Sequence, residues 1–182
     1  MLLANAGLSF EAMAADIDER AIQQKSELSA PGEIALLLAR EKALWVSARK
    51  RGHYVVGADQ TLALGDRLFN KPGDRGQARD QLLALAGRRH ELHSAVTVGQ
   101  DGKIVFAHVA VALMTMRPLD ETEIAAYLDA AGEAVTSSVG AYQLEGLGVH
   151  LFERIEGDHF TILGLPLLPL LAFLRGQRLI AV

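Results

Sequence analysis

Blocks of apolar residues alternate with polar turns along the chain, and their periods predict strands interrupted by helices. Short runs rich in Val, Ile, Leu and Tyr indicate strands, whereas apolar residues that recur every three or four positions indicate helices. The expected helices span residues 2–6, 31–52, 74–85, 120–131 and 167–174. The expected strands span residues 10–14, 54–58, 91–99, 103–116 and 149–155, with a hairpin over 61–69. Segments 16–29 and 132–148 are expected to be loops. This mixture favours an α/β fold with a mixed sheet and flanking helices.

Several element boundaries have a local chemical signal. Pro31 suits the first position of a helix, because its fixed φ is helical and its missing N–H would be unpaired there. Asp74 is expected to cap the helix that comes after it. Asp120 with Glu123 three residues later forms a capping-box pattern. Gly65-Asp66 is a turn signal for the hairpin.

The long helix after Pro31 carries charged residues on or beside its apolar stripe. At about 100° per residue, Ile34, Leu38 and Trp45 fall on one face. Lys42 lies at the edge of that stripe, and Glu41 lies nearer its centre. Charged groups next to an apolar face need a partner, so this helix is expected to border a site.

Polar residues also interrupt the strand-like runs. Asp59 ends an apolar strand, and a carboxylate at such a position usually faces a cation, a metal or a substrate. Lys71, whose backbone is kept extended by the following proline, and Glu145, in a glycine-rich segment, are candidates for the same site. Together they indicate a charged substrate that bears phosphate.

Each of these residues also has a plain structural alternative. Asp59 would serve as the cap of the turn after its strand. Lys42 and Lys71 would be ordinary surface lysines. Glu19 would be a solvated loop residue, and Glu145 would cap its loop. These alternatives stay open from the residues alone.

Composition narrows the class of protein. The chain has 182 residues, which suits one domain or a tightly joined two-lobed one, and 50% of them are hydrophobic. A net charge of −4 argues against a general nucleic-acid binder, and the lack of cysteine excludes disulfides and thiolate metal sites. No segment suggests a membrane span or a signal peptide, so a cytoplasmic protein is expected. The oligomeric state stays open between a monomer and a homodimer.

The histidines do not predict a metal centre. His90-Glu91-Leu92-His93 lacks the His-Glu-x-x-His spacing, and it is expected on or beside a strand rather than on a helix.

The ordered set of short motifs resembles the Maf family of nucleoside triphosphate pyrophosphatases. The motifs keep the family's order along almost the whole chain, 1–182, which the resemblance treats as a single domain. They are Asp18-Glu19, Ala39-Arg40-Glu41-Lys42-Ala43, Gly57-Ala58-Asp59-Gln60, Lys71-Pro72, Gly140-Ala141-Tyr142, Glu145-Gly146 and Gly164-Leu165-Pro166. The resemblance implies a long curved sheet and two lobes around a nucleotide cleft.

The resemblance also implies roles. Asp59 would be the general base that activates water for attack on the α-phosphorus, which yields a monophosphate and pyrophosphate. Lys42 and Lys71 would bind the polyphosphate, and Glu19 would hold a divalent cation or a water. The cation implied by the family is Mg²⁺ or Mn²⁺. A rival interpretation is a nucleotide-binding regulator of cell division, acting in septum inhibition without turnover.

Gln60 and Glu145 occupy the positions that help to choose the base in this family. A branch that prefers dTTP and UTP typically has Thr and Gln there, whereas a 7-methyl-GTP branch has Gln and Glu. Guanine offers two adjacent N–H donors that one carboxylate accepts together, so physics agrees with the second branch. Residues 151–157 also resemble that branch, whereas Gly140-Ala141-Tyr142 resembles the first.

Family members begin with a strand and a Ser-x-Ser-x-Arg-Arg loop, neither of which precedes Met1-Leu2-Leu3 here. Such a loop would bind phosphate at a helix N-terminus. We therefore expect the native reading frame to extend upstream, and the shorter chain to be less stable and less active. The DNA before Met1 tests this expectation.

Overall fold

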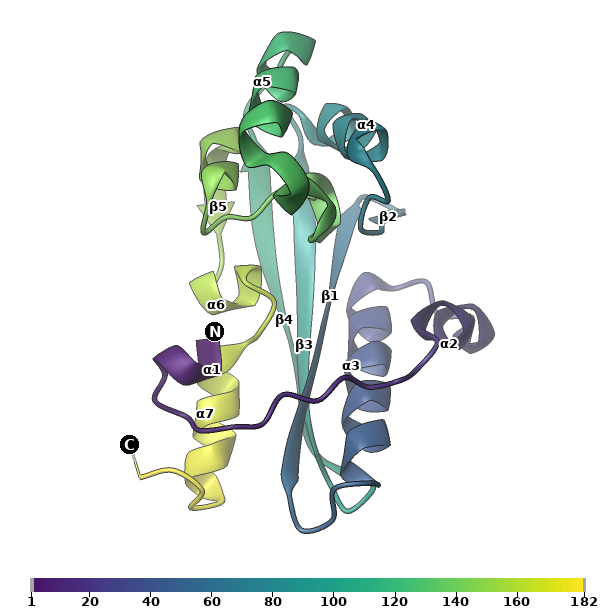
Figure 1. Cartoon of the computed structure of the whole chain (residues 1–182), viewed down its shortest axis with the longest axis vertical. Coiled ribbons are helices and arrows are strands. Elements are labelled where there is room, and N and C mark those ends of the chain that lie inside the picture. Colours follow the sequence, from purple (N-terminus) through teal and green to yellow (C-terminus); the bar gives the residue numbers. More distant parts are fainter. Residues whose placement is uncertain (1, 182) are drawn as a thin grey trace. The chain divides into compact units, whose positions relative to one another are not determined.

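The computed structural model describes residues 2–181 (Figure 1). Contacts divide the chain into two compact units. Among the described residues, unit 1 contains the chain up to Gln60, Ser94–Ala110 and the chain from Gly164 onward. Unit 2 contains Thr61–His93 and Val111–Leu163. Each unit therefore combines segments that are far apart in the sequence.

The described residues form a mixed α/β structure. The α-helices are α1 (Leu2–Asn5), α2 (Glu19–Ser26), α3 (Pro31–Ser47), α4 (Arg75–Leu85), α5 (Glu121–Ala131), α6 (His159–Ile162) and α7 (Leu167–Gly176). The strands are β1 (Tyr54–Leu64), β2 (Arg67–Phe69), β3 (Arg89–Gln100), β4 (Lys103–Met116) and β5 (Phe152–Glu156). They form one sheet in the order β2-β1-β3-β4-β5. The β1–β2 and β4–β5 pairs are antiparallel. The expected α/β class is thus confirmed, whereas the two-lobed nucleotide cleft stays a prediction.

Most sequence signals are confirmed where local chemistry decides the structure. The hairpin turns at Gly65-Asp66, with Leu64 opposite Arg67. Asp120 and Glu123 form both halves of the capping box. Asp74 caps α4 by accepting a hydrogen bond from the Gln77 amide at 2.8 Å. Local hydrogen bonds therefore account for these boundaries.

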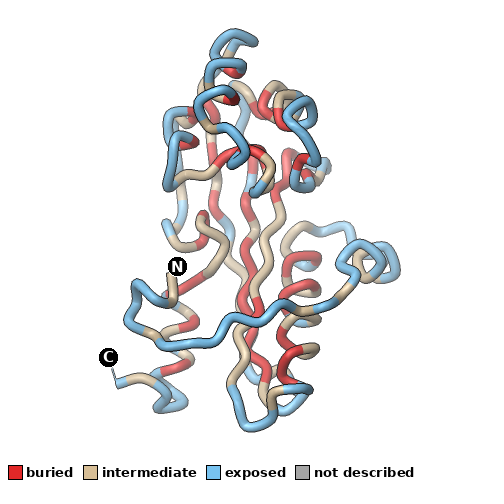
Figure 2. Tube along the Cα trace, viewed as in Figure 1, coloured by how far each residue is buried: buried red, intermediate tan, exposed pale blue. Residues whose placement is uncertain are grey.

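Two expectations in the first thirty residues are wrong. Residues 10–14 form no strand; Phe10, Glu11 and Met13 lie in an exposed extended segment, drawn pale blue in Figure 2. The expected loop over 16–29 contains α2, whose first turn is capped by Asp18. An apolar run alone did not specify a strand, because a strand also needs a neighbour to pair with.

Smaller differences occur elsewhere. The strand expected from Val149 begins at Phe152, because residues 147–151 form a 3₁₀ turn. The segment expected to be a loop over 132–148 also contains 3₁₀ turns, Gly132–Thr136 and Val139–Ala141. No described helix is long and apolar enough to cross a bilayer.

Each unit has its own hydrophobic core. In unit 1, α7 packs Leu170 and Leu174 against Val96 and Val98 of β3. In unit 2, side chains from β1, β3, β4, α4 and α5 surround a larger cluster. The buried members of that cluster include Leu62, Leu82, Leu92, Met114 and Ile124.

Candidate functional site

Helix α3 lies unusually close to β1 and β3 of unit 1. A side-chain carbon added at Gly57 of β1 would lie 2.3 Å from the Ala39 carbonyl oxygen and 2.8 Å from the Ala43 nitrogen. Thr97 of β3 donates a hydrogen bond to the same Ala39 carbonyl at 2.9 Å. Glycine at position 57 therefore allows the close helix–strand approach, and Thr97 fixes its register.

This packing places one lysine beside one aspartate. Lys42 lies next to the buried Ala43 on α3, and Asp59 lies two residues beyond Gly57 on β1. The Lys42 ammonium donates a hydrogen bond to Asp59 Oδ1 at 2.6 Å. The side chains are 25% and 12% exposed, so neither is an ordinary surface group.

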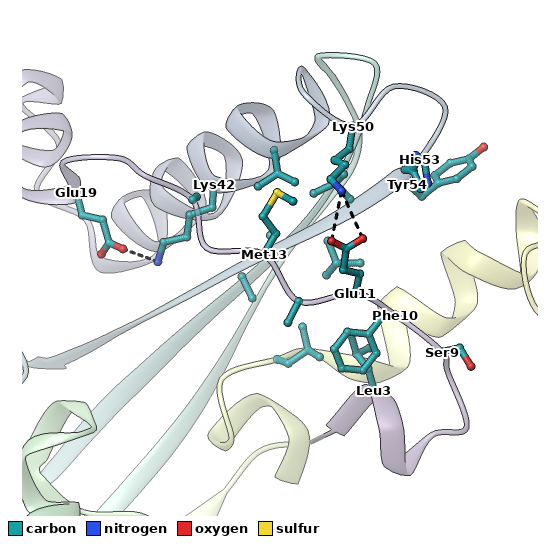
Figure 3. A pocket seen from close by; sticks show the side chains of 18 residues that line it. Leu3, Ser9, Phe10, Glu11, Met13, Glu19, Lys42, Lys50, His53 and Tyr54 are labelled. Carbon is teal, nitrogen blue, oxygen red and sulfur yellow. Dashed lines mark hydrogen bonds and ion pairs between the residues drawn. The ribbon is translucent and has the colours of Figure 1, made fainter.

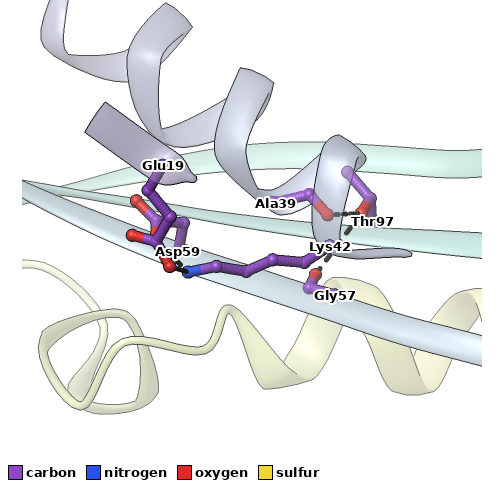
Figure 4. Close-up of polar contacts among 6 residues, drawn as sticks. All are labelled: Glu19, Ala39, Lys42, Gly57, Asp59 and Thr97. Carbon is purple, nitrogen blue, oxygen red and sulfur yellow. Dashed lines mark hydrogen bonds and ion pairs between the residues drawn. The ribbon is translucent and has the colours of Figure 1, made fainter. Parts of the chain in front are cut away.

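A second carboxylate reaches the same ammonium. Glu19 Oε1 lies 2.9 Å from Lys42 Nζ, so one cation joins two acidic groups from different elements (Figure 4). Burial alone would lower the pKa of Lys42, but the hydrogen bonds and charges of Asp59 and Glu19 outweigh it and raise this pKa above its usual value. Lys42 is therefore firmly charged in the resting protein.

Glu19 owes its position to a local cap that the sequence pattern missed. The Asp18 carboxylate accepts a hydrogen bond from the Ala21 amide at 2.9 Å and so starts α2 at Glu19. Asp18 therefore has a structural role as the cap of α2. The available signal was an Asp directly before a polar helix-forming run.

Gln60 comes after Asp59 on β1 and is oriented by a neighbour that sequence reasoning did not identify. Its Nε2 donates a hydrogen bond to the Ser94 hydroxyl at 2.8 Å. Ser94 is fully buried on β3, where a hydroxyl within a strand of largely buried residues was the only signal. Gly164, with φ of +88°, lies near the Gln60 side chain, where an added carbon would be 3.9 Å from it. The Gly164-Leu165-Pro166 motif therefore begins beside the Gln60 side chain.

Lys71 and Glu145 lie in unit 2. Lys71 is exposed after β2, in a loop where Gln81 donates a hydrogen bond to the Asn70 carbonyl at 2.8 Å. Glu145 is exposed in the segment between α5 and β5. Neither side chain forms a hydrogen bond or ion pair with any described residue. Both are therefore accessible to an external anion or base within their own unit.

A cavity of about 820 Å³ in unit 1 reaches this cluster. Its lining combines residues of β1 with the exposed segment after α1, and it includes Lys42 and Glu19. A second ion pair lines the cavity, with Lys50 Nζ 3.3 Å from Glu11 Oε1 (Figure 3). Pockets of this volume are common binding sites for small molecules.

The acidic groups set limits on a metal site. Within residues 2–181, no group of three or more His, Asp or Glu side chains is arranged to hold a metal ion. Asp59 and Glu19 supply two carboxylates around a single position. Magnesium is commonly held by one or two carboxylates together with substrate phosphates and water. The residues therefore fit a cation that arrives with a polyphosphate.

His90 and His93 lie on β3, which confirms their expected place on or beside a strand. His93 Nε2 lies 2.7 Å from Glu91 Oε2. His90 is buried and bonded to Tyr142 in the core of unit 2.

The profile of Maf-like proteins matches residues 1–177, so the chain belongs to the Maf-like protein family. It is 72% identical over 182 residues to a nucleoside triphosphate pyrophosphatase of Bradyrhizobium diazoefficiens, covering 100% of this chain and 90% of that protein.

Two further relatives bear related names. A nucleoside triphosphate pyrophosphatase of Rhodopseudomonas palustris strain HaA2 is 66% identical over 180 residues, covering 99% of this chain and 89% of that protein. A 7-methyl-GTP pyrophosphatase of Mesorhizobium japonicum is 55% identical over 177 residues, covering 96% of this chain and 88% of that protein.

Proposed function

We propose that this protein is a nucleoside triphosphate pyrophosphatase, which hydrolyses the bond between the α- and β-phosphates. The observation that carries the proposal is the Lys42 ammonium held between Asp59 and Glu19. A fixed cation beside a half-buried carboxylate is the pairing that phosphoanhydride hydrolysis needs. The relatives from Bradyrhizobium and Rhodopseudomonas support the same activity.

In this proposal Asp59 orients and deprotonates the attacking water. A carboxylate has about four lone-pair sites, so one group can accept hydrogen bonds from an ammonium and from a water together. Lys42 neutralises charge that develops on the polyphosphate in the transition state, and Lys71 is proposed to add a second positive charge. Compact ammonium groups suit phosphate oxygens in this role.

We propose that Mg²⁺ or Mn²⁺ enters with the triphosphate. Asp59 and Glu19 would hold the cation, and when bound it would supply neutralisation of the phosphate oxygens. Glu19 reaches Lys42 from an exposed position, its side chain being 49% exposed, so it is free to turn toward an incoming cation.

The position of bond cleavage tests the function directly. Hydrolysis in ¹⁸O-water is expected to place the label in the nucleoside monophosphate, because water attacks the α-phosphorus. Mass spectrometry of the separated products measures it. Label in orthophosphate, with nucleoside diphosphate as the second product, would contradict the mechanism. No turnover of any triphosphate with either metal would favour the regulatory alternative, which no observation supports at present.

We further propose that the base is a modified purine such as that of 7-methyl-GTP. Gln60 and Glu145 are the residues proposed to select it, through the two adjacent donors of guanine. The 7-methyl-GTP pyrophosphatase relative supports this direction.

A competition assay tests the choice of base. The wild-type protein should hydrolyse 7-methyl-GTP in preference to dTTP and UTP. Changing Gln60→Thr and Glu145→Gln together should shift the ratio of kcat/KM values toward pyrimidines by about tenfold or more, since one bidentate contact is worth ~1–3 kcal/mol. The single variants Gln60→Thr and Glu145→Gln are measured as well, to separate the effects of the two positions. A wild-type preference for dTTP would overturn the base assignment and leave the reaction unaffected.

We also propose that the protein is cytoplasmic and that it forms a homodimer. The absence of cysteine from the sequence supports a reducing compartment. Cell fractionation tests the first, and light scattering of the purified protein tests the second.

A further inference from the structure

Three aromatic rings meet in the core of unit 2. His90, at the start of β3, is 1% exposed, and its Nε2 lies 2.8 Å from the Tyr142 hydroxyl. The two ring centres are 5.8 Å apart, and Phe152 of β5 packs on both. Burial lowers the pKa of His90 to about 4, although the Arg88 backbone opposes this shift. The imidazole is therefore neutral, and burial raises the pKa of Tyr142 well above its usual range.

Both partners of this buried hydrogen bond are uncharged, so its effect is to hold the two side chains in place. His90 Nδ1 is buried and has no hydrogen-bond partner of good geometry among the described residues. Leaving a buried nitrogen poorly paired is unfavourable for folding. An apolar side chain would pack at this position without that penalty. The bond to Tyr142 is therefore the feature that an imidazole supplies here.

Tyr142 belongs to the segment between α5 and β5, which several side chains hold in place. The Tyr127 hydroxyl donates to the Ala141 carbonyl at 3.1 Å. The Ser138 hydroxyl donates to the Tyr142 carbonyl at 2.6 Å. The Gly140 amide donates to Gln81 Oε1 at 3.2 Å. The backbone around Tyr142 is thus fixed from three sides.

The same backbone is strained. Gly140 has φ of +78°, and Ala141, which carries a side chain, has φ of +62°. A carbon added at Gly140 would lie 2.6 Å from Leu62 Cδ1 and 2.7 Å from the Tyr142 ring. Left-handed non-glycine residues persist only where their surroundings enforce them, and they concentrate at functional sites. The enforced conformation sets the direction in which the chain leaves Tyr142.

The turn that carries Glu145 begins directly after Tyr142. The Gly146 amide donates to the Gln143 carbonyl at 3.2 Å, which closes a four-residue turn with Glu145 as its third residue. Gly148 packs against Gln143 so closely that an added carbon would lie 2.4 Å from the Gln143 carbonyl oxygen. The exposed Glu145 side chain is therefore presented by a short, closed turn that starts one residue after the Tyr142 anchor.

We propose that the His90–Tyr142 hydrogen bond is a positioning pair for base selection, because it anchors the turn that presents Glu145. The inference rests on the proposed function, in which Glu145 contacts a purine. Neither His90 nor Tyr142 contacts the nucleotide. Their contribution is to limit the orientations of the Glu145 carboxylate in the free protein. Less conformational entropy is then lost when the purine binds.

The test removes only the phenol oxygen, in Tyr142→Phe. Two readouts are measured on the folded protein: amide hydrogen exchange of Gly140 and Gly146, and steady-state kinetics with 7-methyl-GTP and UTP. The two amides are expected to exchange roughly 3- to 10-fold faster, which is the net effect of one neutral hydrogen bond. KM for 7-methyl-GTP should rise by a similar factor with kcat unchanged, whereas both constants for UTP should stay constant.

A double variant separates positioning from general loss of stability. Glu145→Gln should also raise KM for 7-methyl-GTP, and Tyr142→Phe should add little in that background, because the anchored carboxylate is already gone. Met114→Val, at a fully buried position of β4, serves as a control that removes core atoms. It should leave unchanged both the exchange rates of the two amides and the KM ratio, which is KM for 7-methyl-GTP divided by KM for UTP.

The possible failures are distinguishable. Unchanged amide exchange of Gly140 and Gly146 in Tyr142→Phe would show that the His90–Tyr142 hydrogen bond does not hold the turn in place. Faster exchange with an unchanged KM ratio would overturn its link to base selection. If the wild-type protein hydrolyses no nucleotide, the proposed function fails, and calorimetric binding of a non-hydrolysable 7-methyl-GTP analogue replaces KM. Equal binding of the analogue by wild type and Tyr142→Phe, or no binding by either, would overturn the inference.

Discussion

Asp59→Asn is expected to lower turnover by about 100- to 10,000-fold, which is the usual contribution of a positioned general base. Asparagine keeps the shape of the side chain but cannot take a proton from water. The amide oxygen can still accept the Lys42 hydrogen bond, and Glu19 remains as an anionic partner of that ammonium. Nucleotide binding should therefore be largely preserved while the chemical step is lost.

Pyrophosphate release measures the turnover of this variant, and calorimetry with a non-hydrolysable triphosphate measures its binding. Asp66→Asn, in the exposed turn of the β1–β2 hairpin, is the matched control and should retain full activity. Thermal unfolding shows whether the protein is intact. Near-normal turnover in a folded Asp59→Asn protein would reduce Asp59 to a structural partner of Lys42.

Gly57→Ala is expected to cause a large loss of folding stability, because the added methyl group would meet main-chain atoms of α3. The new methyl would lie 2.3 Å from the Ala39 carbonyl oxygen and 2.9 Å from the Ala43 side chain. Main-chain atoms cannot rotate away, so α3 must move from β1, and overpacking of this kind costs about 3 kcal/mol or more. Since α3 carries Lys42, its contact with Asp59 should be disturbed and activity should fall as well.

Chemical denaturation of wild type and variant gives the free energy of unfolding for comparison. Gly73→Ala is the control, because its new methyl would lie no closer than 3.5 Å to another atom and its φ is not left-handed. That variant should stay within roughly 1 kcal/mol of wild type. An unchanged stability of Gly57→Ala would mean that α3 has room to shift, which would weaken the account of how Lys42 is placed.

The fold could be predicted where neighbouring residues decide the structure. Asp120 with Glu123, and the Gly65-Asp66 turn, each specify their element through bonds within a few residues. The helix α2 was missed because its sequence is mostly polar and it buries none of its residues. The apolar run near Phe10 predicted a strand that is absent, since strand pairing depends on distant chain.

The candidate site was predictable in its residues but not in its geometry. Lys42, Asp59 and Glu19 were identified from motifs, yet the ammonium between two carboxylates depends on close packing at Gly57. Ser94 and His90 carried only a weak signal, because a buried polar residue is informative only when its partner is known. Those partners lie 34 and 52 residues away in the sequence.

The pairing of Glu19 with Lys42 adds an electrostatic link between α2 and α3. The helix contributes no fully buried residue, and a partly exposed ion pair weakens as dissolved salt screens it, over about 8 Å at physiological ionic strength. Any anion that occupies Lys42 competes with Glu19 for the same ammonium. Arrival of a triphosphate would therefore release Glu19 from Lys42, so that binding of the substrate and the turn of Glu19 toward the incoming cation are one exchange of partners.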